Sequence, residues 1–295
     1  MVVLVTGANG QLGQSLQHIA DRWRPGLQFV FCNSQQLDIT DPQSIKAAFE
    51  RYKPDYCINA AAYTAVDKAE SEPERAFAIN VTAVKQLAEV CKAQHTVLLH
   101  VSTDFVFDGT KTTPYTEQDT PNPQSVYGHT KREGELAIQA VLDRYYIIRT
   151  SWVYSQFGNN FLKTMLRLGS ERDSLQVVSD QIGTPTNAVD LAEALCTMVT
   201  RLAAATATGA APAAPGIYNY SNEGQCSWYE FAKKIFEIHK IKIDLHPIPT
   251  SSYPTPAKRP KYSVLDKTML KDVFGLKISD WQESLKFYTD KNDTL

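Results

Sequence analysis

The chain begins with an apolar run that leads directly into a turn rich in glycine, Val2-Val-Leu-Val-Thr-Gly-Ala-Asn-Gly-Gln-Leu-Gly13. This pattern predicts a buried strand that turns sharply into a helix. We expect Gly7 to allow the tight turn, Gly10 to let backbone N–H groups approach a pyrophosphate, and Gly13 to let the helix pack on the strand. The segment therefore favours the first strand–turn–helix unit of a dinucleotide-binding sheet.

A second motif lies in the middle of the chain. Ser102-Thr-Asp104 ends another apolar run, and Tyr127-Gly-His-Thr-Lys131 follows it. Tyr127 and Lys131 are four residues apart, so a helix places both on one face. Either motif alone is weak evidence, because glycines also serve packing and most tyrosine–lysine pairs on helices are solvated. Together, and in this order, they predict nicotinamide-dependent chemistry on a carbonyl or an alcohol.

The second motif suits the reduction of a ketone, which needs a hydride on carbon and a proton on oxygen. A free tyrosine has a pKa of about 10, and we expect the Lys131 ammonium to stabilise the phenolate of Tyr127 and lower that pKa. Lys131 should also reach a ribose hydroxyl of the cofactor. Thr103 offers a hydroxyl to the same substrate oxygen. Asp104 is expected to orient the substrate or the threonine, or simply to form a turn.

The composition excludes several classes of function. The 295 residues are 43% hydrophobic and 21% charged, and their formal net charge is -2. The sequence has no basic stripe that would favour a nucleic-acid partner, and no apolar run that would favour a membrane span. Five scattered cysteines lack the paired spacing of a zinc site, so reduced thiols are expected. A strand at the amino terminus leaves no room for a signal peptide, which predicts a cytoplasmic protein.

The first half alternates between strand-like and helical patterns, which is typical of an α/β fold with helices on both faces of a parallel sheet. We predict a Rossmann-type doubly wound parallel sheet over residues 1–150. A smaller C-terminal substrate-binding lobe should occupy residues 151–295, with some segments returning to the sheet, and should cap its carboxyl edge. The predicted strands are residues 2–5, 28–31, 56–59, 97–102, 145–148 and 217–219.

Helices are expected over residues 190–202, 228–239 and 280–288. Asp41 followed by Pro42 has the pattern of a helix cap with proline at the first helical position. The run from Ala203 to Gly216 is low in complexity, and we predict a mobile surface loop there.

With these motifs the chain resembles the dTDP-4-dehydrorhamnose reductase family, which are extended short-chain dehydrogenases/reductases. The resemblance implies reduction of the C4 ketone of dTDP-4-dehydro-6-deoxy-L-mannose to dTDP-L-rhamnose with NADPH or NADH. It spans nearly the whole chain, because it continues through Asn59-Ala-Ala-Ala-Tyr-Thr-Ala-Val-Asp-Lys-Ala-Glu-Ser-Glu-Pro73, Ser102-Thr-Asp-Phe-Val-Phe-Asp-Gly109, Arg149-Thr-Ser-Trp-Val-Tyr154, Gly158-Asn-Asn-Phe161, Gly183-Thr-Pro-Thr186 and Tyr253-Pro-Thr-Pro-Ala-Lys-Arg-Pro260.

The resemblance also implies the roles of individual residues. Catalysis would rest on Tyr127, Lys131 and Thr103. The substrate would be held by Thr103, Asp104, Trp152, Asn160 and Arg259, the last because a guanidinium suits phosphate geometry. Cofactor contacts would come from Gly7, Gly10, Gln11, Leu12, Gly13, Asp38, Ile39, Ala62, Tyr63, Thr64, Tyr127 and Lys131.

The residues leave the cofactor open between NADPH and NADH. The second predicted strand leads into Phe31-Cys-Asn-Ser34. This segment has neither the acid that holds a ribose 2′-hydroxyl nor the arginine that accommodates a 2′-phosphate. Asp38 is the nearest acid, and its position suits the adenine amino group better than the ribose.

One departure from the family concerns assembly. Some members form metal-bridged dimers through glutamates at the positions of Ser15 and Val189 in this chain. Neither residue can supply a carboxylate to a hard cation. We therefore expect no metal, and a monomer or a weak dimer without a bridging metal.

Other functions on the same fold remain open. A sugar-nucleotide 4,6-dehydratase needs an acid–base pair directly after the threonine, but Phe105 follows Asp104 here. Another sugar-nucleotide reductase or epimerase would keep the fold and the tyrosine–lysine pair. A non-enzymatic regulatory subunit would not need Thr103, Tyr127 and Lys131 intact, so their presence weighs against that alternative.

Overall fold

A computed structural model describes residues 1–290, and in this part of the chain six parallel strands form the central sheet. The spatial order is β10-β5-β4-β3-β1-β2. From β1 the chain first adds β2 on one side and then β3 on the other, and ligands bind at such a reversal in open α/β sheets. The strands are β1 (Val2–Thr6), β2 (Gln28–Cys32), β3 (Tyr56–Asn59), β4 (Val97–Thr103), β5 (Tyr145–Thr150) and β10 (Gly216–Asn219).

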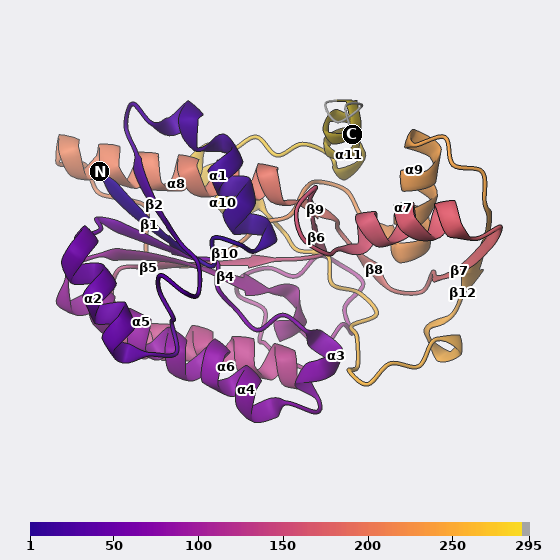
Figure 1. The fold of residues 1–295 in the computed structure, drawn as a ribbon, viewed down its shortest axis with the longest axis horizontal. Helices are drawn as coiled ribbons and strands as arrows, with labels where there is room; N and C mark the ends of the chain where they lie inside the picture. The colour runs from indigo at the N-terminus through magenta and orange to yellow at the C-terminus, as the bar shows by residue number, and fades with distance from the viewer. Residues whose placement is uncertain (291–295) are drawn as a thin grey trace.

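Helices cover both faces of this sheet (Figure 1), so its central strands are apolar on both sides. Val3, Leu4 and Val5 in β1 are completely buried. One face carries α1 (Gln11–Trp23), α8 (Ala188–Thr208) and α10 (Thr268–Phe274). The other face carries α2 (Pro42–Tyr52), α5 (Ala83–Ala93) and α6 (Val126–Val141).

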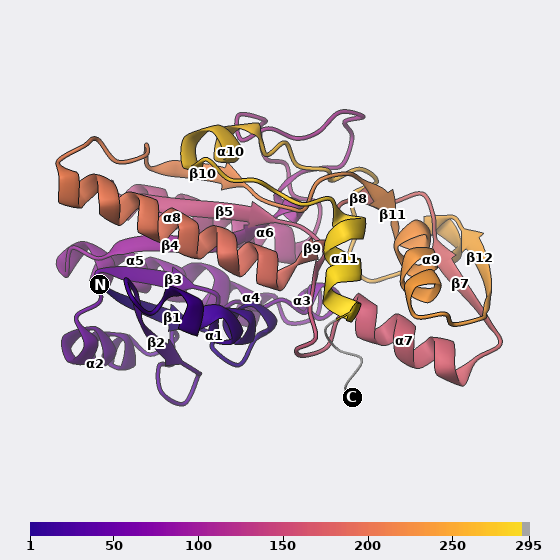
Figure 2. The same ribbon diagram turned by 90° about the horizontal axis from the view of Figure 1, so that it is seen from above.

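A smaller lobe lies beyond the carboxyl ends of β4 and β5 (Figure 2). Its apolar core gathers around Phe231 and Trp281. The elements of the lobe are α7 (Phe161–Glu171), the parallel pair β7 (Ser174–Val178) and β12 (Asp244–Ile248), α9 (Trp228–Ile238) and α11 (Trp281–Asp290).

Short elements complete the fold. Two-residue strands pair between the lobes: β6 (Val153–Tyr154) with β9 (Thr186–Asn187), and β8 (Ile182–Gly183) with β11 (Cys226–Ser227). The remaining turns are α3 (Val66–Ala69), α4 (Pro73–Phe77), a π-helical turn η1 (Ala78–Thr82), and the 3₁₀ turns η2 (Asp104–Val106) and η3 (Thr250–Ser252).

The structure confirms the predicted fold class, and α8, β10 and α10 return to the sheet after residue 150. The domain boundary at 150 itself stays a prediction. Asp41 caps α2 by accepting from the backbone N–H of Gln43, and Pro42 is the first residue of that helix, as predicted. All five cysteines are free and buried.

The loop predicted from Ala203 was wrong in its first part. Helix α8 continues to Thr208, because alanine has the highest helix propensity of all residues. Gly209 then ends the helix with a left-handed φ of 69°. Within residues 1–290, no helix is both long enough and apolar enough to cross a membrane.

Candidate active site

The glycine-rich turn joins β1 to α1 at the carboxyl edge of the sheet. Gly7 has a φ of 67°, and a Cβ atom there would lie 2.8 Å from the backbone nitrogen of Ala61. A Cβ atom at Gly13 would collide with the carbonyl oxygen of Gly7. Gly10 precedes α1, so no capping side chain covers the N–H groups at the start of this helix. The close approaches at Gly7 and Gly13 require glycine. The uncovered N–H groups at the start of α1 fit the pyrophosphate of a dinucleotide.

Gln11, in the first turn of α1, reaches the second lobe. Its Oε1 accepts from the Asn160 amide at 2.9 Å and from the Ser155 hydroxyl at 3.0 Å. Asn160 also caps α7, because its Oδ1 accepts from the backbone N–H of Lys163. The structure thus brings together a predicted cofactor residue and a predicted substrate residue. Leu12 instead points into the buried core beneath the turn.

Asp38 and Ile39 lie after β2. Asp38 is exposed, and its Oδ1 accepts from both the backbone N–H and the hydroxyl of Thr40, at 2.9 and 2.7 Å. Ile39 is buried. Asp38 Oδ1 therefore helps to shape the loop that follows β2.

Ala62, Tyr63 and Thr64 follow β3, and Tyr63 belongs to the small apolar cluster that contains Tyr127. Asn80, which no sequence motif singled out, holds this loop in place. Its amide accepts from the backbone N–H of Tyr63 at 2.9 Å and donates to the Tyr63 carbonyl at 3.1 Å. Asn80 lies in the π-helical turn η1, a conformation often found at functional sites.

Thr103 ends β4, and Tyr127 lies in the first turn of α6. Ser125 starts that helix by accepting from the backbone N–H of Gly128 at 3.1 Å. A Cβ atom at Gly128 would collide with the carbonyl oxygen of Phe105, so glycine allows α6 to approach the strand end. As a result the phenol of Tyr127 lies close to Thr103 and Asp104 at the end of β4.

The electrostatics of this set follow from burial. Burial raises the pKa of Tyr127 to about 12, and the charge of Asp104 adds to the increase, while the hydrogen bond with Thr103 opposes it. The predicted lowering by Lys131 is not seen. Burial lowers the pKa of Lys131 to about 8, against the effect of Glu135. The reason is geometric, since Lys131 Nζ donates to the carbonyl of Val101 at 2.7 Å instead of to the phenol.

Asp104 is buried beside this set. Burial raises the pKa of its carboxyl group to about 6, although hydrogen bonds, that of Ser263 first, lower it. Its Oδ1 accepts from the Thr103 hydroxyl at 3.0 Å, so the carboxylate orients the threonine. Phe105 turns its ring edge-to-face toward Tyr127, with centroids 5.7 Å apart. An apolar ring thus stands where a dehydratase would need an acid or a base.

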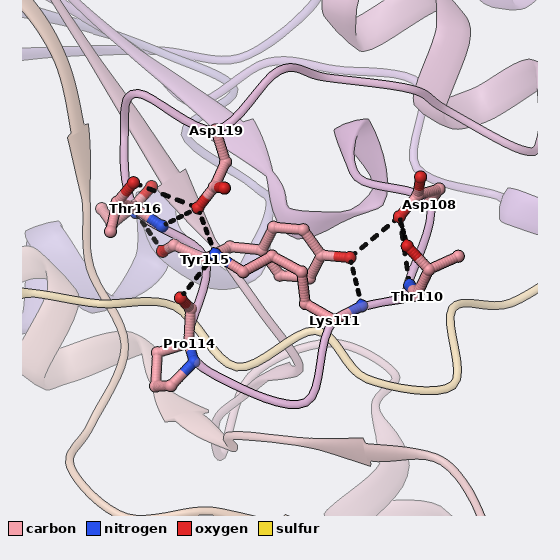
Figure 3. A network of polar contacts seen from close by, with 8 residues as sticks. Asp108, Thr110, Lys111, Pro114, Tyr115, Thr116 and Asp119 are labelled. Carbon is pink, nitrogen blue, oxygen red and sulfur yellow. Dashed lines mark hydrogen bonds and ion pairs between the residues drawn. The ribbon is translucent and has the colours of Figure 1, made fainter.

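A network of polar contacts holds the loop that follows Asp104 (Figure 3). The Tyr115 hydroxyl donates to Asp108 Oδ1 at 2.9 Å and accepts from the backbone N–H of Lys111 at 3.2 Å. Lys111 Nζ donates to Asp119 Oδ2 at 2.6 Å. Backbone and side-chain hydrogen bonds, those of Thr110 foremost, lower the pKa of Asp108 to about 2. This network fixes the loop immediately beyond the reactive strand end.

Trp152 connects the catalytic edge to the second lobe. Its backbone has a left-handed φ of 46°, a strained conformation that clusters at functional sites. The ring stacks on Trp228 with centroids 3.6 Å apart. Gly183 makes this possible, because a Cβ atom there would lie 2.6 Å from the indole.

A cleft of about 930 Å³ opens in the second lobe beside Trp228. Thr103, Tyr127 and Lys131 do not line it; its walls include Phe161, Gln181, Trp228, Tyr253 and Arg259. Trp228 lines the cleft and stacks on Trp152, which follows the carboxyl end of β5. Arg259 lies on the cleft wall and pairs with Asp67 on α3.

The positions that the family uses for a bridging metal have no carboxylates here. Ser15 is buried in α1 and donates to the carbonyl of Gln11 at 2.8 Å. Val189 lies in the first turn of α8. The side chains described over residues 1–290 include no group of three or more histidine, cysteine or acidic residues placed to hold a metal ion.

A doubly wound sheet with this glycine turn, and a threonine, a tyrosine and a lysine at its carboxyl edge, defines a nicotinamide-dependent oxidoreductase of the short-chain dehydrogenase/reductase class. Residues 1–293 match the family model described as the RmlD substrate binding domain. The chain belongs to this family, among the dTDP-4-dehydrorhamnose reductases.

Relatives support this assignment over the full length. A dTDP-4-dehydrorhamnose reductase of Sinorhizobium fredii is 41% identical over 290 residues, which cover 97% of this chain and 96% of that protein. The crystal structure of a dTDP-4-dehydrorhamnose reductase from Clostridium acetobutylicum superposes with a TM-score of 0.91 at 41% identity and covers 100% of both chains. The enzyme of Bacillus anthracis, solved in complex with NADP, has a TM-score of 0.90 at 37% identity, covering 98% of this chain and 99% of that one.

Proposed function

We propose that this protein reduces the C4 ketone of dTDP-4-dehydro-6-deoxy-L-mannose to dTDP-L-rhamnose with NADPH or NADH. The observation that carries the proposal is the grouping of Thr103, at the end of β4, with Tyr127 and Lys131, which lie one helical turn apart in α6. The names of relatives that match nearly the whole chain support the choice of substrate.

In the proposed reaction, Tyr127 gives its hydroxyl proton to the C4 oxygen. Its raised pKa keeps the phenol protonated at neutral pH, so the proton is available. The Thr103 hydroxyl donates to Asp104 Oδ1 in this structure. When the substrate binds, this O–H would turn from the carboxylate to the same substrate oxygen. A bound dihydronicotinamide supplies the hydride to C4. In its charged form, Lys131, on the same helix face, would favour the phenolate that remains.

The residues that would hold the cofactor are those of the glycine-rich turn and of the loops after β2 and β3. The N-terminus of α1 and Gly10 would receive the pyrophosphate. The loop with Asp38 and Ile39 would lie beside the adenine. The choice between NADPH and NADH is left open, and the related enzyme of Bacillus anthracis was solved with NADP.

The second lobe would hold the nucleotide portion of the substrate. The cleft beyond Trp228 is large enough for a nucleotide and is lined by apolar rings and by Arg259, whose guanidinium suits a diphosphate. Trp152 would contact the sugar between the cleft and Tyr127. Cytoplasmic location, the absence of a bridging metal and a monomeric or weakly dimeric state stay predictions.

The test is to incubate the protein with dTDP-4-dehydro-6-deoxy-L-mannose and either NADPH or NADH, and to identify the product. We expect stoichiometric oxidation of the cofactor and formation of dTDP-L-rhamnose. A parallel incubation with dTDP-glucose should give no product, because Phe105 cannot act as acid or base. Conversion of dTDP-glucose to a 4-keto sugar without net cofactor consumption would refute the proposal in favour of a dehydratase.

A further inference from the structure

A buried chain of polar side chains runs from β1 to Lys131, and the proposed reaction does not account for it. Thr6 in β1 donates to Asn59 Oδ1 in β3 at 2.6 Å. Asn59 Nδ2 lies 2.9 Å from His100 Nδ1 in β4. His100 Nε2 lies 3.2 Å from Lys131 Nζ. All four side chains are at most 2% exposed, so water does not compete for these contacts.

The direction of the hydrogen bonds is decided at Asn59. Its Oδ1 also meets the backbone N–H of Ala61 at 3.2 Å. A backbone N–H can only donate, so the atom that it meets is the amide oxygen. The amide nitrogen therefore faces His100 and donates to it. It follows that His100 Nδ1 accepts and carries no proton.

This assignment has a consequence for Lys131. Burial, together with the nearby charge of Lys131, lowers the pKa of His100 well below its ordinary value, so the imidazole is neutral. A neutral imidazole whose Nδ1 accepts carries its proton on Nε2. That N–H points at Lys131 Nζ. An ammonium group has no lone pair to accept it, whereas an uncharged amine has one and still donates to the Val101 carbonyl.

We propose that Asn59 holds His100 in the tautomer protonated on Nε2, and that this N–H, directed at Lys131, favours the uncharged amine. His100 is then a positioning residue that acts through Lys131. Glu135, one turn further along α6, favours the charged form of Lys131, while burial favours the uncharged form of this side chain. Tyr127, one turn before, is the remaining titratable group beside Lys131 on α6.

The tautomer can be measured without any substrate. In protein labelled with ¹⁵N-histidine there are six histidine side chains to distinguish, and loss of one signal set in His100→Asn assigns His100. We expect the ¹⁵N shifts of a neutral ring protonated on Nε2 between pH 6 and 8. A ring protonated on Nδ1, or an imidazolium at pH 7, would overturn the proposal.

A matched pair of variants tests whether Asn59 sets the tautomer of His100. In Asn59→Asp a carboxylate replaces the amide and can only accept, so His100 should carry its proton on Nδ1 and accept from the Lys131 ammonium. Thr6→Val removes one bond to Asn59 but keeps the Ala61 N–H that orients the amide. We expect the tautomer to switch in the first variant and to stay unchanged in the second. A switch in both or in neither would contradict the proposed role of Asn59.

The effect on turnover rests on the proposed function. If the charged form of Lys131 supports turnover, kcat/KM should fall as the pH rises through its pKa of about 8. In Asn59→Asp this fall should move to higher pH by about one unit or more, the size expected for a charged hydrogen bond. If the fall of kcat/KM at high pH stays at the same pH in Asn59→Asp, the proposed effect of His100 on the charge of Lys131 is refuted.

An inactive wild type with the expected tautomer would refute only the proposed function. Should Asn59→Asp fail to fold, the wild-type tautomer still decides.

Discussion

Arg259 and Asp67 form a bidentate ion pair between the loop that precedes α10 and helix α3. Nη1 lies 3.0 Å from Oδ1 and Nη2 lies 2.7 Å from Oδ2. The pair lowers the pKa of Asp67. Arg259 Nη1 also donates to the carbonyl of Ala257 at 3.1 Å. Of the five N–H donors of a guanidinium, two remain for a ligand. Asp67 thus orients Arg259 on the cleft wall and leaves two of its N–H donors free to bind phosphate.

Arg259→Lys should weaken binding of the nucleotide sugar, because lysine cannot hold Asp67 with two parallel hydrogen bonds and bind phosphate at the same time. We expect KM for the substrate to rise by about 10–100-fold, the equivalent of one charged hydrogen bond. KM for the cofactor should not change. Arg24→Lys, whose side chain is 73% exposed in a surface pair with Asp21, serves as the control. An unchanged substrate KM in Arg259→Lys would remove Arg259 from the substrate site.

Tyr127→Phe keeps the ring in its apolar cluster but removes the phenol. Turnover should fall by about 10²–10⁴-fold, the usual contribution of acid–base catalysis. Cofactor affinity, measured by fluorescence titration with NADPH, should remain close to that of the wild type. If the variant turns over at a near-normal rate, Tyr127 is not the proton donor.

The buried pair of Glu135 and Arg149 should make stability depend on pH. Burial alone would raise the pKa of Glu135, but hydrogen bonds and the charge of Arg149 bring it below the ordinary value of 4.5. A lowered pKa in the folded state means that the pair stabilises the protein above the unfolded pKa, and that this contribution is lost as the pH falls below about 4.5. Urea midpoints measured from pH 7 to pH 3 should show this loss.

Glu135→Gln isolates the same interaction at pH 7. The variant removes the carboxylate that pairs with the completely buried Arg149, which should cost about 3–5 kcal/mol of unfolding free energy. Glu50→Gln, which breaks a solvent-exposed pair with Lys46, should cost less than about 1 kcal/mol. An equal loss of unfolding free energy in the two variants would show that the buried pair stabilises the protein no more than the exposed pair does.

Chelation should have no effect. Ser15 and Val189 offer no carboxylates at the positions where family glutamates bridge subunits, so we expect treatment with EDTA to leave both turnover and molecular mass unchanged. Turnover assays and light scattering before and after dialysis provide the measurement. Loss of activity that magnesium restores would reveal that other carboxylates bind a metal.

Much of the fold could be predicted because its signals are local. The six parallel strands and the glycine turn appear as apolar runs and fixed spacings, and β1 extends only one residue past the predicted range. The segment after Ala203 was misjudged because its low complexity concealed the high helix propensity of alanine. The predicted site residues at the strand ends were likewise visible, since residues that end parallel strands share one edge.

The sequence by itself determined the dinucleotide-binding sheet, the position of Thr103 at a strand end and the common helix face of Tyr127 and Lys131. Only the tertiary structure decided what each polar group contacts. Lys131 turns toward Val101 and His100 instead of the phenol, and Asn80 locks the loop of Tyr63. Spacing along one element fixes which way side chains face, whereas hydrogen-bond partners 17 to 31 residues apart depend on how helices dock on the sheet. That docking buries the groups, and burial sets their pKa values.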